Sequence, residues 1–338
     1  MRKSMRITID ATAAAILAAA ALTGCGAGGR TQEKTAGEYA ADDKTAAAES
    51  GSPENEGGNL SGTVTVTTGR GAAELPVNPE RVAVFDMGIL DSMESLGVEV
   101  EVAVPTDSLL SGLSKYKSAV NAGGIKEPDL ETIYEFEPDL IVISGRQEAF
   151  YDELSEIAPT WYVETVYENL MENFTANYTV LGQIFGKEEA VSAALEEIGR
   201  QIASVQARAG SMEERALILL ANDGAISAYG SGSRFGLIHD VLGVRAADAA
   251  IDASTHGQSV GYEYIAGVNP DILFVVDRAA VVAGSTDAGD TLDNDLVRST
   301  NAYKNGKIVY LDAENWYLAG AGLRTLSEMI GEVETALY

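Results

Sequence analysis

The stretch THGQSVGYEYIAGVNPDILFVVDR, from Thr255 to Arg278, decides the fold of this chain. Its first half contains a helix-like segment, and Asn269-Pro270-Asp271 then forms a turn. The apolar run from Ile272 to Val276 is short, rich in β-branched residues and bounded by polar residues, which is typical of a buried strand. The stretch therefore predicts one unit of helix, turn and buried strand that ends at an arginine.

A second stretch of similar design, LETIYEFEPDLIVISGR, runs from Leu130 to Arg146. In each copy a glutamate stands seven positions before the proline and an arginine eight positions after it. These residues are Glu131, Pro138 and Arg146 in the first copy and Glu263, Pro270 and Arg278 in the second. The repetition predicts that the chain has two similar halves.

Strand and helix patterns alternate on both sides of a purely helical region, which favours α/β lobes with mostly parallel sheets. The helical region has an apolar residue at every third or fourth position, as one face of a long helix requires. These residues are Val191, Ala194, Leu195, Ile198, Ile202 and Val205. We expect an N-terminal lobe over 61–186, a linking helix over 187–210 and a C-terminal lobe over 211–338. A single larger domain with an internal duplication is the alternative.

The composition limits the possible ligands. The 338 residues include 51 acidic and 23 basic side chains, which give a formal net charge of −28. This charge argues against nucleic acid as a partner, because the protein would repel its phosphates. The length allows a large core or two domains of ordinary size. An anionic ligand would need a site made locally positive by a few arginines.

The N-terminus has the features of a lipoprotein signal. A basic start is followed by an apolar run from Ala11 to Leu22, and Leu22-Thr23-Gly24-Cys25 has the form of a processing site. The run is about half the ~20 residues that a membrane-spanning helix needs. We expect a signal peptide over 1–24, lipidation of Cys25 and a flexible tether over 25–60. Cys25 is the only cysteine, so no intrachain disulfide can form.

Several further motifs match a known family in order and spacing. They are Tyr229-Gly-Ser-Gly-Ser-Arg-Phe-Gly236, Thr255-His-Gly-Gln-Ser259, Asn269-Pro-Asp with Val275-Val-Asp-Arg278, and Trp316-Tyr-Leu318. With the lipoprotein signal and the paired units, they make the chain from Gly62 to Tyr338 resemble the solute-binding proteins of bacterial iron–siderophore import systems. The resemblance is greatest to the branch that binds ferric catecholates of the petrobactin and enterobactin-fragment type.

The resemblance implies a class III solute-binding protein, in which two α/β lobes are joined by one long α-helix. It also implies a cleft between the lobes, modest closure on binding and delivery of the ligand to an ATP-driven (ABC) membrane permease. The protein would be a monomer with no enzymatic activity and no intrinsic cofactor, and Fe(III) would be bound only as the siderophore complex. It would be held by its lipid on the outside of the cell membrane, as on a Gram-positive surface.

Carried over from the family, Arg146, Arg234 and Arg278 would line the cleft. A guanidinium stays charged, donates several hydrogen bonds and can stack on catechol rings, so it suits a strongly anionic ferric catecholate. Arg146 and Arg278 follow equivalent predicted strands, at the edge where open α/β sheets bind ligands. Arg234 could instead mark the start of a helix, and any single arginine could be a surface residue.

The same resemblance implies that His256 and Tyr317 bind the metal. A tetradentate siderophore leaves two positions open on six-coordinate iron, and an imidazole nitrogen and a phenolate oxygen can fill them. Taken alone, Tyr317 is more often a packing aromatic, and its distance along the chain from His256 does not bring the two together. The other histidine, His239, lies in a segment with helical spacing and is interpreted as structural.

The resemblance further implies that Glu131 and Glu263, one on each lobe, dock the permease. Each begins a predicted helix, where a carboxylate is also favourable against the helix dipole without any partner. Their equivalent placement favours paired contacts with arginines of the permease.

Carriers of haem or cobalamin with the same fold are the close alternative. An enzyme built on two such lobes is less favoured, because the chain has two histidines, no phosphate-binding loop and no G-x-S-x-G elbow. A zinc or manganese carrier would usually have a cluster of histidines, which the sequence lacks.

Overall fold

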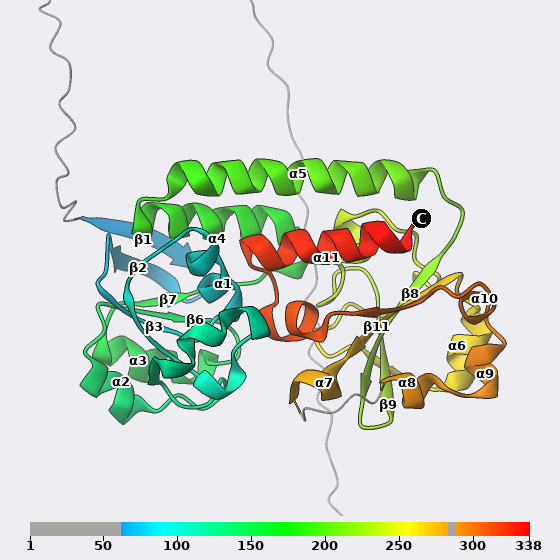
Figure 1. Ribbon diagram of the computed structural model, residues 1–338, viewed down its shortest axis with the longest axis horizontal. Helices are drawn as coiled ribbons and strands as arrows, with labels where there is room; N and C mark the ends of the chain where they lie inside the picture. The colour runs from blue at the N-terminus through cyan, green and yellow to red at the C-terminus, as the bar shows by residue number, and fades with distance from the viewer. Residues whose placement is uncertain (1–61, 283–287) are drawn as a thin grey trace, which may run out of the picture. The chain divides into compact units, whose positions relative to one another are not determined.

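The structure is a computed structural model that describes residues 62–282 and 288–338 (Figure 1). The first half contains β1 (Thr63–Thr68), β2 (Gly71–Pro76), β3 (Arg81–Val84), α1 (Met87–Ser95), β4 (Glu101–Val104), the 3-10 helices η1 (Thr106–Ser108) and η2 (Ser111–Ser118), β5 (Val120–Asn121), α2 (Leu130–Phe136), β6 (Leu140–Ile143), η3 (Glu148–Phe150), α3 (Tyr151–Ile157), β7 (Thr160–Tyr162), η4 (Tyr167–Asn169) and α4 (Leu170–Phe185).

The second half follows the long helix α5 (Glu188–Gly210). It contains β8 (Ala216–Asn222), β9 (Ala225–Tyr229), the π-helical turn η5 (Leu237–Val241), β10 (Gln258–Val260), α6 (Tyr262–Val268), β11 (Ile272–Asp277), α7 (Arg278–Val282), α8 (Ala288–Leu292), α9 (Asp295–Arg298), α10 (Asn301–Lys304), β12 (Ile308–Leu311), the π-helical turn η6 (Glu314–Ala319) and α11 (Leu323–Ala336).

The first lobe is built on a sheet with the strand order β5-β4-β3-β6-β7, and every neighbouring pair in it is parallel. Side chains on one face pack with α1 and α4, and those on the other face pack with α2 and α3. Because both faces are covered, β6 is a continuous run of buried aliphatic residues rather than an alternating one. The hairpin β1-β2 forms a separate two-stranded sheet.

The second lobe has a sheet with the order β10-β9-β8-β11-β12. Its strands β8, β11 and β12 are parallel, whereas β9 and β10 are antiparallel to their neighbours. Asp223 and Gly224 join β8 to β9, with φ of 49° and 75°. Two successive positive φ values are what a two-residue hairpin turn requires, and Asp-Gly supplies them at low cost. The predicted fold class, two lobes with mostly parallel sheets, is confirmed.

Both copies of the repeated unit form the predicted helix, turn and strand. The helices α2 and α6 each end at a residue in the left-handed conformation, with φ of 50° and 48°. The aspartate after each proline, Asp139 or Asp271, then accepts a backbone hydrogen bond at the edge of its sheet, from Arg81 N at 2.9 Å and from Arg215 N at 3.0 Å. As a result, β6 and β11 take the same place in their sheets.

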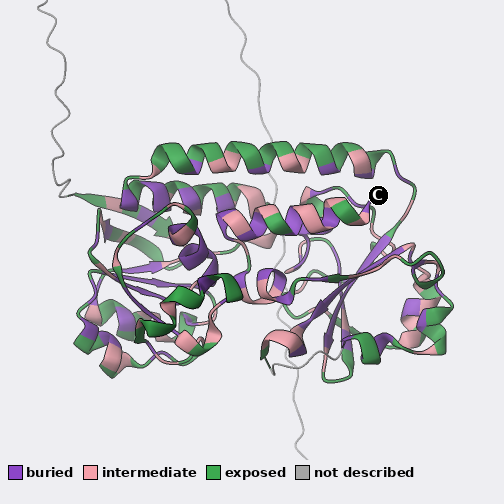
Figure 2. Ribbon diagram, in the orientation of Figure 1, coloured by how far each residue is buried: buried purple, intermediate pink, exposed green. Residues whose placement is uncertain are grey.

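The long helix α5 packs against α4 and α11, alongside both lobes (Figure 1). Its predicted apolar face is confirmed, because Val191, Ile198 and Val205 are buried and the apolar residues between them pack on the same core. That core is continuous from the first sheet through α5 and α11 to the second sheet. Figure 2 shows the outer face of α5 exposed above the buried strands. The lobes are therefore two sheets that share one hydrophobic core.

The predicted signal peptide (1–24), Cys25 and the tether (25–60) lie outside the described residues. Across residues 62–282 and 288–338, none of the helices combines the length and the apolar content needed to cross a bilayer. The strand β2, the π-helical turns and the short helices α8 to α10 were not predicted from the sequence.

Candidate functional site

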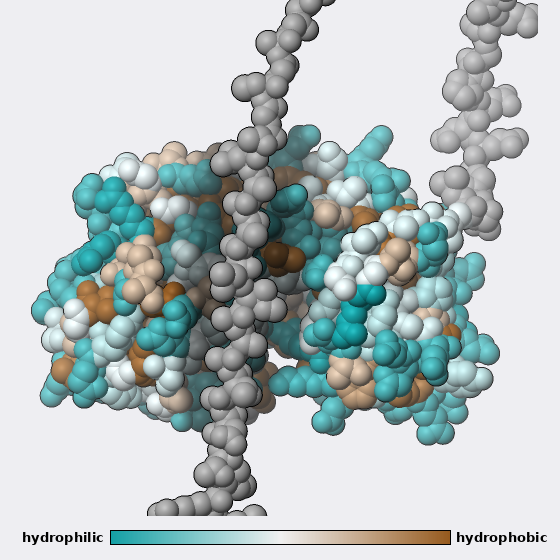
Figure 3. Space-filling model, turned by 180° about the vertical axis from the view of Figure 1, so that it is seen from behind, coloured by the Kyte–Doolittle hydropathy of each residue, from teal (hydrophilic) through white to brown (hydrophobic). Residues whose placement is uncertain are grey.

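The three predicted arginines come from both lobes. Arg146 lies three residues beyond β6, and Arg278 is the first residue of α7, directly after β11. Arg234 precedes η5 in the second lobe. All three side chains are half-buried. The surface between the two lobes is hollowed, as Figure 3 shows from behind.

The three guanidinium groups meet around Tyr317, in the π-helical turn η6. Arg146 Nη2 and Arg234 Nη2 both donate to the backbone carbonyl oxygen of Tyr317, at 2.6 and 2.5 Å. Arg278 Nε donates to the phenol oxygen of Tyr317 at 2.7 Å, and its Nη1 donates to Asn222 Oδ1 at 2.5 Å. Side chains from opposite lobes thus converge on one residue.

The ring of Tyr317 also lies against the positive charges. The Cζ atoms of Arg234 and Arg278 are 4.3 and 5.5 Å from the ring centroid, which is the range of cation–π contacts. Burial alone would raise the pKa of the phenol, but the hydrogen bond from Arg278 and the charges of Arg234, Arg278 and Lys126 together lower it. The phenolate form, which is the form that binds metals, is therefore easier to reach here than in a free tyrosine.

The positive charge of the three arginines is only partly balanced by the nearby carboxyl of Asp86. Burial and the nearby charge of Arg234 lower the pKa of Arg146. Asp86, the N-cap of α1, accepts from Ile89 N at 2.9 Å. Burial raises the pKa of the Asp86 carboxyl, although hydrogen bonds from Ile89 and Ser144 and the charge of Arg146 oppose that rise. A half-buried carboxyl that resists ionisation offsets the arginines only in part, so the site favours an anion.

Sequence reasoning missed Asn222, Asp86 and Tyr229. Asn222 ends β8 and Asp86 lies just beyond β3, so both stand at the carboxyl ends of central strands, which was the available signal. The Tyr229 ring lies 4.6 Å from the ring of Phe235, which in turn lies 6.4 Å from that of Trp316. Burial raises the pKa of Tyr229 to about 12, although the charges of Arg234 and Arg278 oppose that rise. This aromatic row supports η6 from the second lobe.

The two histidines lie in different surroundings. His239 is half-buried, its Nδ1 lies 2.8 Å from the Val244 carbonyl oxygen, and burial lowers its pKa, so its predicted structural role fits. His256 is exposed in the loop before β10, where its backbone N–H donates to Ser254 Oγ at 3.1 Å. Within the described ranges, no hydrogen bond joins its imidazole to Tyr317. The structure therefore gathers the arginines and Tyr317 but not His256.

The next residue, Gly257, shows how close the His256 loop comes to the site. Its φ is +73°, and an added Cβ would lie 2.7 Å from ring atoms of Tyr229. Tyr229 in turn lies near enough to Arg234 and Arg278 for their charges to affect its pKa. His256 thus stands one residue from a wall of the arginine site. Among the described residues no group of three or more His, Cys, Asp or Glu side chains is arranged to hold a metal ion.

Glu131 and Glu263 occupy equivalent places, each as the second residue of its helix, α2 or α6. Both side chains are exposed. The helix N-caps differ, because Asp129 caps α2 by accepting from Thr132 N, whereas Gly261 precedes α6 without a side-chain cap. The two glutamates are thus available at the surface of their respective lobes.

A family model described as periplasmic binding protein matches residues 82–315 of this chain. The match runs from β3 into η6 and so includes both sheets and the three arginines.

Several characterised proteins are similar over most of their length. The petrobactin-binding protein YclQ of Bacillus subtilis (strain 168) is 45% identical over 271 residues, which are 79% of this chain and 86% of YclQ. The ferric-anguibactin-binding protein FatB of Vibrio anguillarum is 36% identical over 264 residues, which are 75% of this chain and 81% of FatB.

Solved structures agree with the sequence comparison. The crystal structure of YclQ superposes with a TM-score of 0.79 and 43% identity, covering 81% of this chain and 98% of YclQ. The catecholate-siderophore binding protein VctP of Vibrio cholerae gives a TM-score of 0.77 and 37% identity, covering 81% of this chain and 99% of VctP. The two-lobed fold is therefore shared with both.

Proposed function

This chain belongs to the periplasmic binding protein family, and from that premise we propose that it is the extracytoplasmic solute-binding component of an ABC importer that captures a ferric siderophore of the catecholate type. The relatives are named for petrobactin, ferric anguibactin and catecholate siderophores. They are binding proteins, and we assign this chain no catalytic role and no resident cofactor.

The observation that carries the proposal is the gathering of Arg146, Arg234 and Arg278 around Tyr317. The protein as a whole has a formal net charge of −28 and repels anions. A ferric catecholate is anionic, planar in its rings and rich in oxygen acceptors, and guanidinium groups match each of these properties. Without such a ligand, two of the arginines share a single carbonyl oxygen, so an anion with several oxygens would satisfy more of their donors.

Iron would enter as part of the ligand. Where the siderophore leaves two iron positions vacant, Tyr317 and His256 fill them in this proposal. The lowered pKa of Tyr317 supports its role, because a phenolate is a hard oxygen ligand. The loop of His256 lies beside Tyr229 and its imidazole is exposed, so in this proposal the loop moves to bring His256 to the iron.

The remaining assignments concern the cell surface. We propose that Cys25 is lipidated after removal of residues 1–24, so that the protein is anchored to the outer face of the cell membrane, and that it acts as a monomer. Glu131 and Glu263 would dock the permease, one from each lobe. The lobes would span 61–186 and 211–338, with 187–210 as the linking helix.

A ligand panel tests the proposal directly. Fluorescence quenching is measured with ferric bis- and tris-catecholates, ferric hydroxamates, haem and cobalamin. We expect tight quenching by a ferric catecholate and a broad visible charge-transfer band that weakens in Tyr317→Phe and His256→Ala. An intense Soret band with haem, or binding of cobalamin alone, would instead assign the protein to one of those carriers.

Permease docking needs a separate experiment. Glu131→Ala and Glu263→Ala should bind ferric catecholate as the wild type does but should reduce cellular iron uptake. Normal uptake in the double variant would remove the docking role and leave ligand binding intact.

A further inference from the structure

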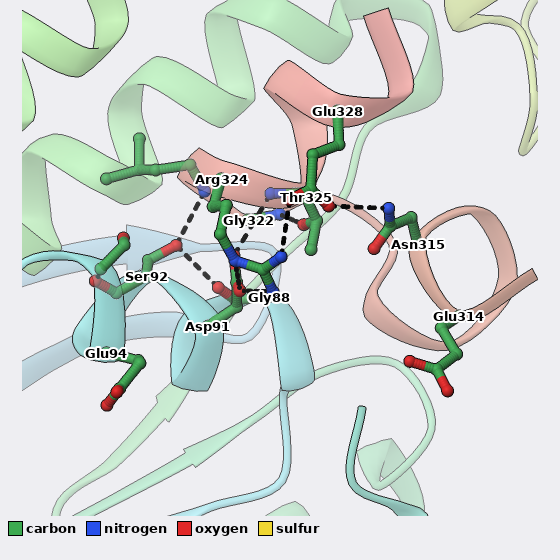
Figure 4. Close-up of polar contacts among 12 residues, drawn as sticks. Gly88, Asp91, Ser92, Glu94, Glu314, Asn315, Gly322, Arg324, Thr325 and Glu328 are labelled. Atoms are coloured by element: carbon green, nitrogen blue, oxygen red, sulfur yellow. Dashed lines mark hydrogen bonds and ion pairs between the residues drawn. The ribbon is translucent and has the colours of Figure 1, made fainter. Parts of the chain in front are cut away.

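The π-helical turn η6, which carries Tyr317, is held from outside the ligand site. Asn315 Nδ2 donates to Glu328 Oε2 at 3.0 Å, and Glu328 Oε1 accepts from Arg324 Nη1 at 2.7 Å. Arg324 Nε donates to Asp91 Oδ1 of α1 at 2.8 Å. We call Asp91, Arg324, Glu328 and Asn315 the Asp91–Asn315 chain; Figure 4 shows its links from α1 through α11 to η6.

Asp91, the first-lobe end of the Asp91–Asn315 chain, is firmly fixed. Asp91 is fully buried, with an exposed fraction of 0%, and its other carboxylate oxygen accepts from Thr325 N at 3.3 Å. The backbone of α1 also closely approaches the segment just before α11, because an added Cβ at Gly88 would lie 2.5 Å from the Ala321 carbonyl oxygen. Tyr178 Oη donates to that same oxygen at 2.5 Å. A charge buried in such a junction keeps its partner Arg324 in one place.

A second contact ties η6 to the first lobe directly. Glu314 Oε2 accepts a hydrogen bond from Ser111 N, at the start of η2, at 2.7 Å. Glu314 and Asn315 are neighbours, so the first lobe holds the beginning of η6 directly at Glu314 and through α11 at Asn315. Tyr317 follows two residues later and presents its carbonyl oxygen to Arg146 and Arg234.

We infer that Glu328 is a positioning residue for ligand binding, which acts through Asn315 to set the position of Tyr317 relative to the arginines. Glu328 is the one member of the Asp91–Asn315 chain that joins α11 to η6. It lies outside the site and does not touch the arginines around Tyr317. The inference rests on the proposed function, because its effect is read in the retention of an anionic ligand.

Trp316 can report on the position of η6 in the protein without ligand. Trp316 lies in η6 between Asn315 and Tyr317, and the sequence contains only one other tryptophan, Trp161. Trp161 is buried in the first lobe, and in the described part of the chain its indole N–H has no hydrogen-bond partner. Trp161→Phe therefore loses no hydrogen bond and leaves Trp316 as the single tryptophan, which is excited selectively over the tyrosines at long wavelength.

The experiment compares variants in the full-length Trp161→Phe background, using acrylamide quenching without ligand and stopped-flow dissociation of a ferric bis-catecholate. In Glu328→Ala we expect Trp316 to become more accessible to acrylamide and the ligand to leave about three- to tenfold faster, as loss of the one hydrogen bond that joins Glu328 to η6 predicts. Asn315→Ala should give the same changes, and the double variant should not exceed either single variant.

Two further variants separate positioning from general loss of stability. Glu328→Gln keeps one oxygen that can accept from Asn315 but loses the charge that Arg324 contacts, so it should restore both readouts in part. Arg200→Ala, which breaks an exposed ion pair with Glu197 on α5, should leave both readouts at their starting values.

Three results would overturn the inference. Unchanged quenching in Glu328→Ala would mean that the Asp91–Asn315 chain does not hold η6. Altered quenching with an unchanged dissociation rate would mean that η6 does not control ligand retention, while the proposed function would stand. Absence of ligand binding in the Trp161→Phe parent and in the wild type would reject the proposed function itself, and the positioning role with it.

Discussion

The two copies of the repeated unit place an arginine at the same point of two similar lobes but surround it differently. In the second lobe Arg278 bonds to two side chains, the phenol of Tyr317 and the neutral amide of Asn222. In the first lobe Arg146 bonds to a backbone carbonyl oxygen, and the nearby side chain is the acid Asp86. The same backbone device therefore supplies a cation bonded to a phenol and an amide on one side and a cation beside a carboxyl on the other.

This difference indicates a division of roles. A guanidinium held by a side-chain amide keeps its full charge and a fixed orientation, which suits recognition of one ligand geometry. A guanidinium beside a carboxyl contributes less net field, and one that bonds to a carbonyl can rotate more readily to a new acceptor. We expect the second lobe to determine which anion binds and the first lobe to add attraction.

The largest effect is expected from Arg278→Ala. It removes two hydrogen bonds of a charged group and the positive charge beside Tyr317, so the affinity for a ferric bis-catecholate should fall about 30- to 100-fold. Arg278→Lys should recover little, because an ammonium cannot bond to both partners in the same geometry. Quenching titrations measure both variants, and a loss below about threefold in Arg278→Ala would contradict the assigned role.

Asn222→Asp should make the surroundings of Arg278 resemble those of Arg146, which lies beside a carboxyl. A carboxylate in place of the amide would pair with Arg278 and offset its charge, so affinity should fall about tenfold and depend less steeply on salt. Asn222→Ala is the matched control, because it removes the hydrogen bond without adding charge and should cost about threefold. Equal losses in the two variants would show that charge compensation is not the reason for the asymmetry.

Arg146→Ala should have a smaller effect than Arg278→Ala, about five- to tenfold in affinity. Because Arg146 donates to a carbonyl oxygen and not to a side chain within the described residues, Arg146→Lys should retain most of the binding, in contrast to Arg278→Lys. Titrations at low and at physiological salt would compare the two lysine variants. If the lysine is tolerated equally at both positions, the two arginines have the same role.

The smallest effect is expected from Asp86→Asn, a gain of about two- to threefold in affinity, because the amide no longer offsets Arg146. The folded-state pKa of Asp86 is raised, so its stabilising contribution is complete below the unfolded value of about 3.9 and is lost as pH rises through the folded value. Asp86→Asn should therefore gain melting temperature relative to the wild type between pH 4 and pH 7. A difference that is constant with pH would contradict the raised pKa of Asp86.

Much of the architecture follows from local sequence pattern. The repeated Pro-Asp units, the apolar face of α5 and the arginines after β6 and β11 are all set by spacing along the chain. The partners of those arginines cannot be found from spacing along the chain. Asn222 and Asp86 reach the site only because β8 and β3 lie beside β11 and β6 in their sheets. The carbonyl oxygen of Tyr317 is a backbone group exposed by a π-helical turn, which side-chain patterns do not reveal.

The continuous core determines whether one lobe can fold without the other and how the protein unfolds on heating. The inner faces of both sheets pack into one cluster with α5 and α11, and α11 returns from the end of the chain to meet α1 near its start. Neither half could bury its inner face if expressed alone, so an isolated lobe should be insoluble, and heating should melt the intact protein in one calorimetric transition. Any ligand held between the lobes would raise that single transition as a whole.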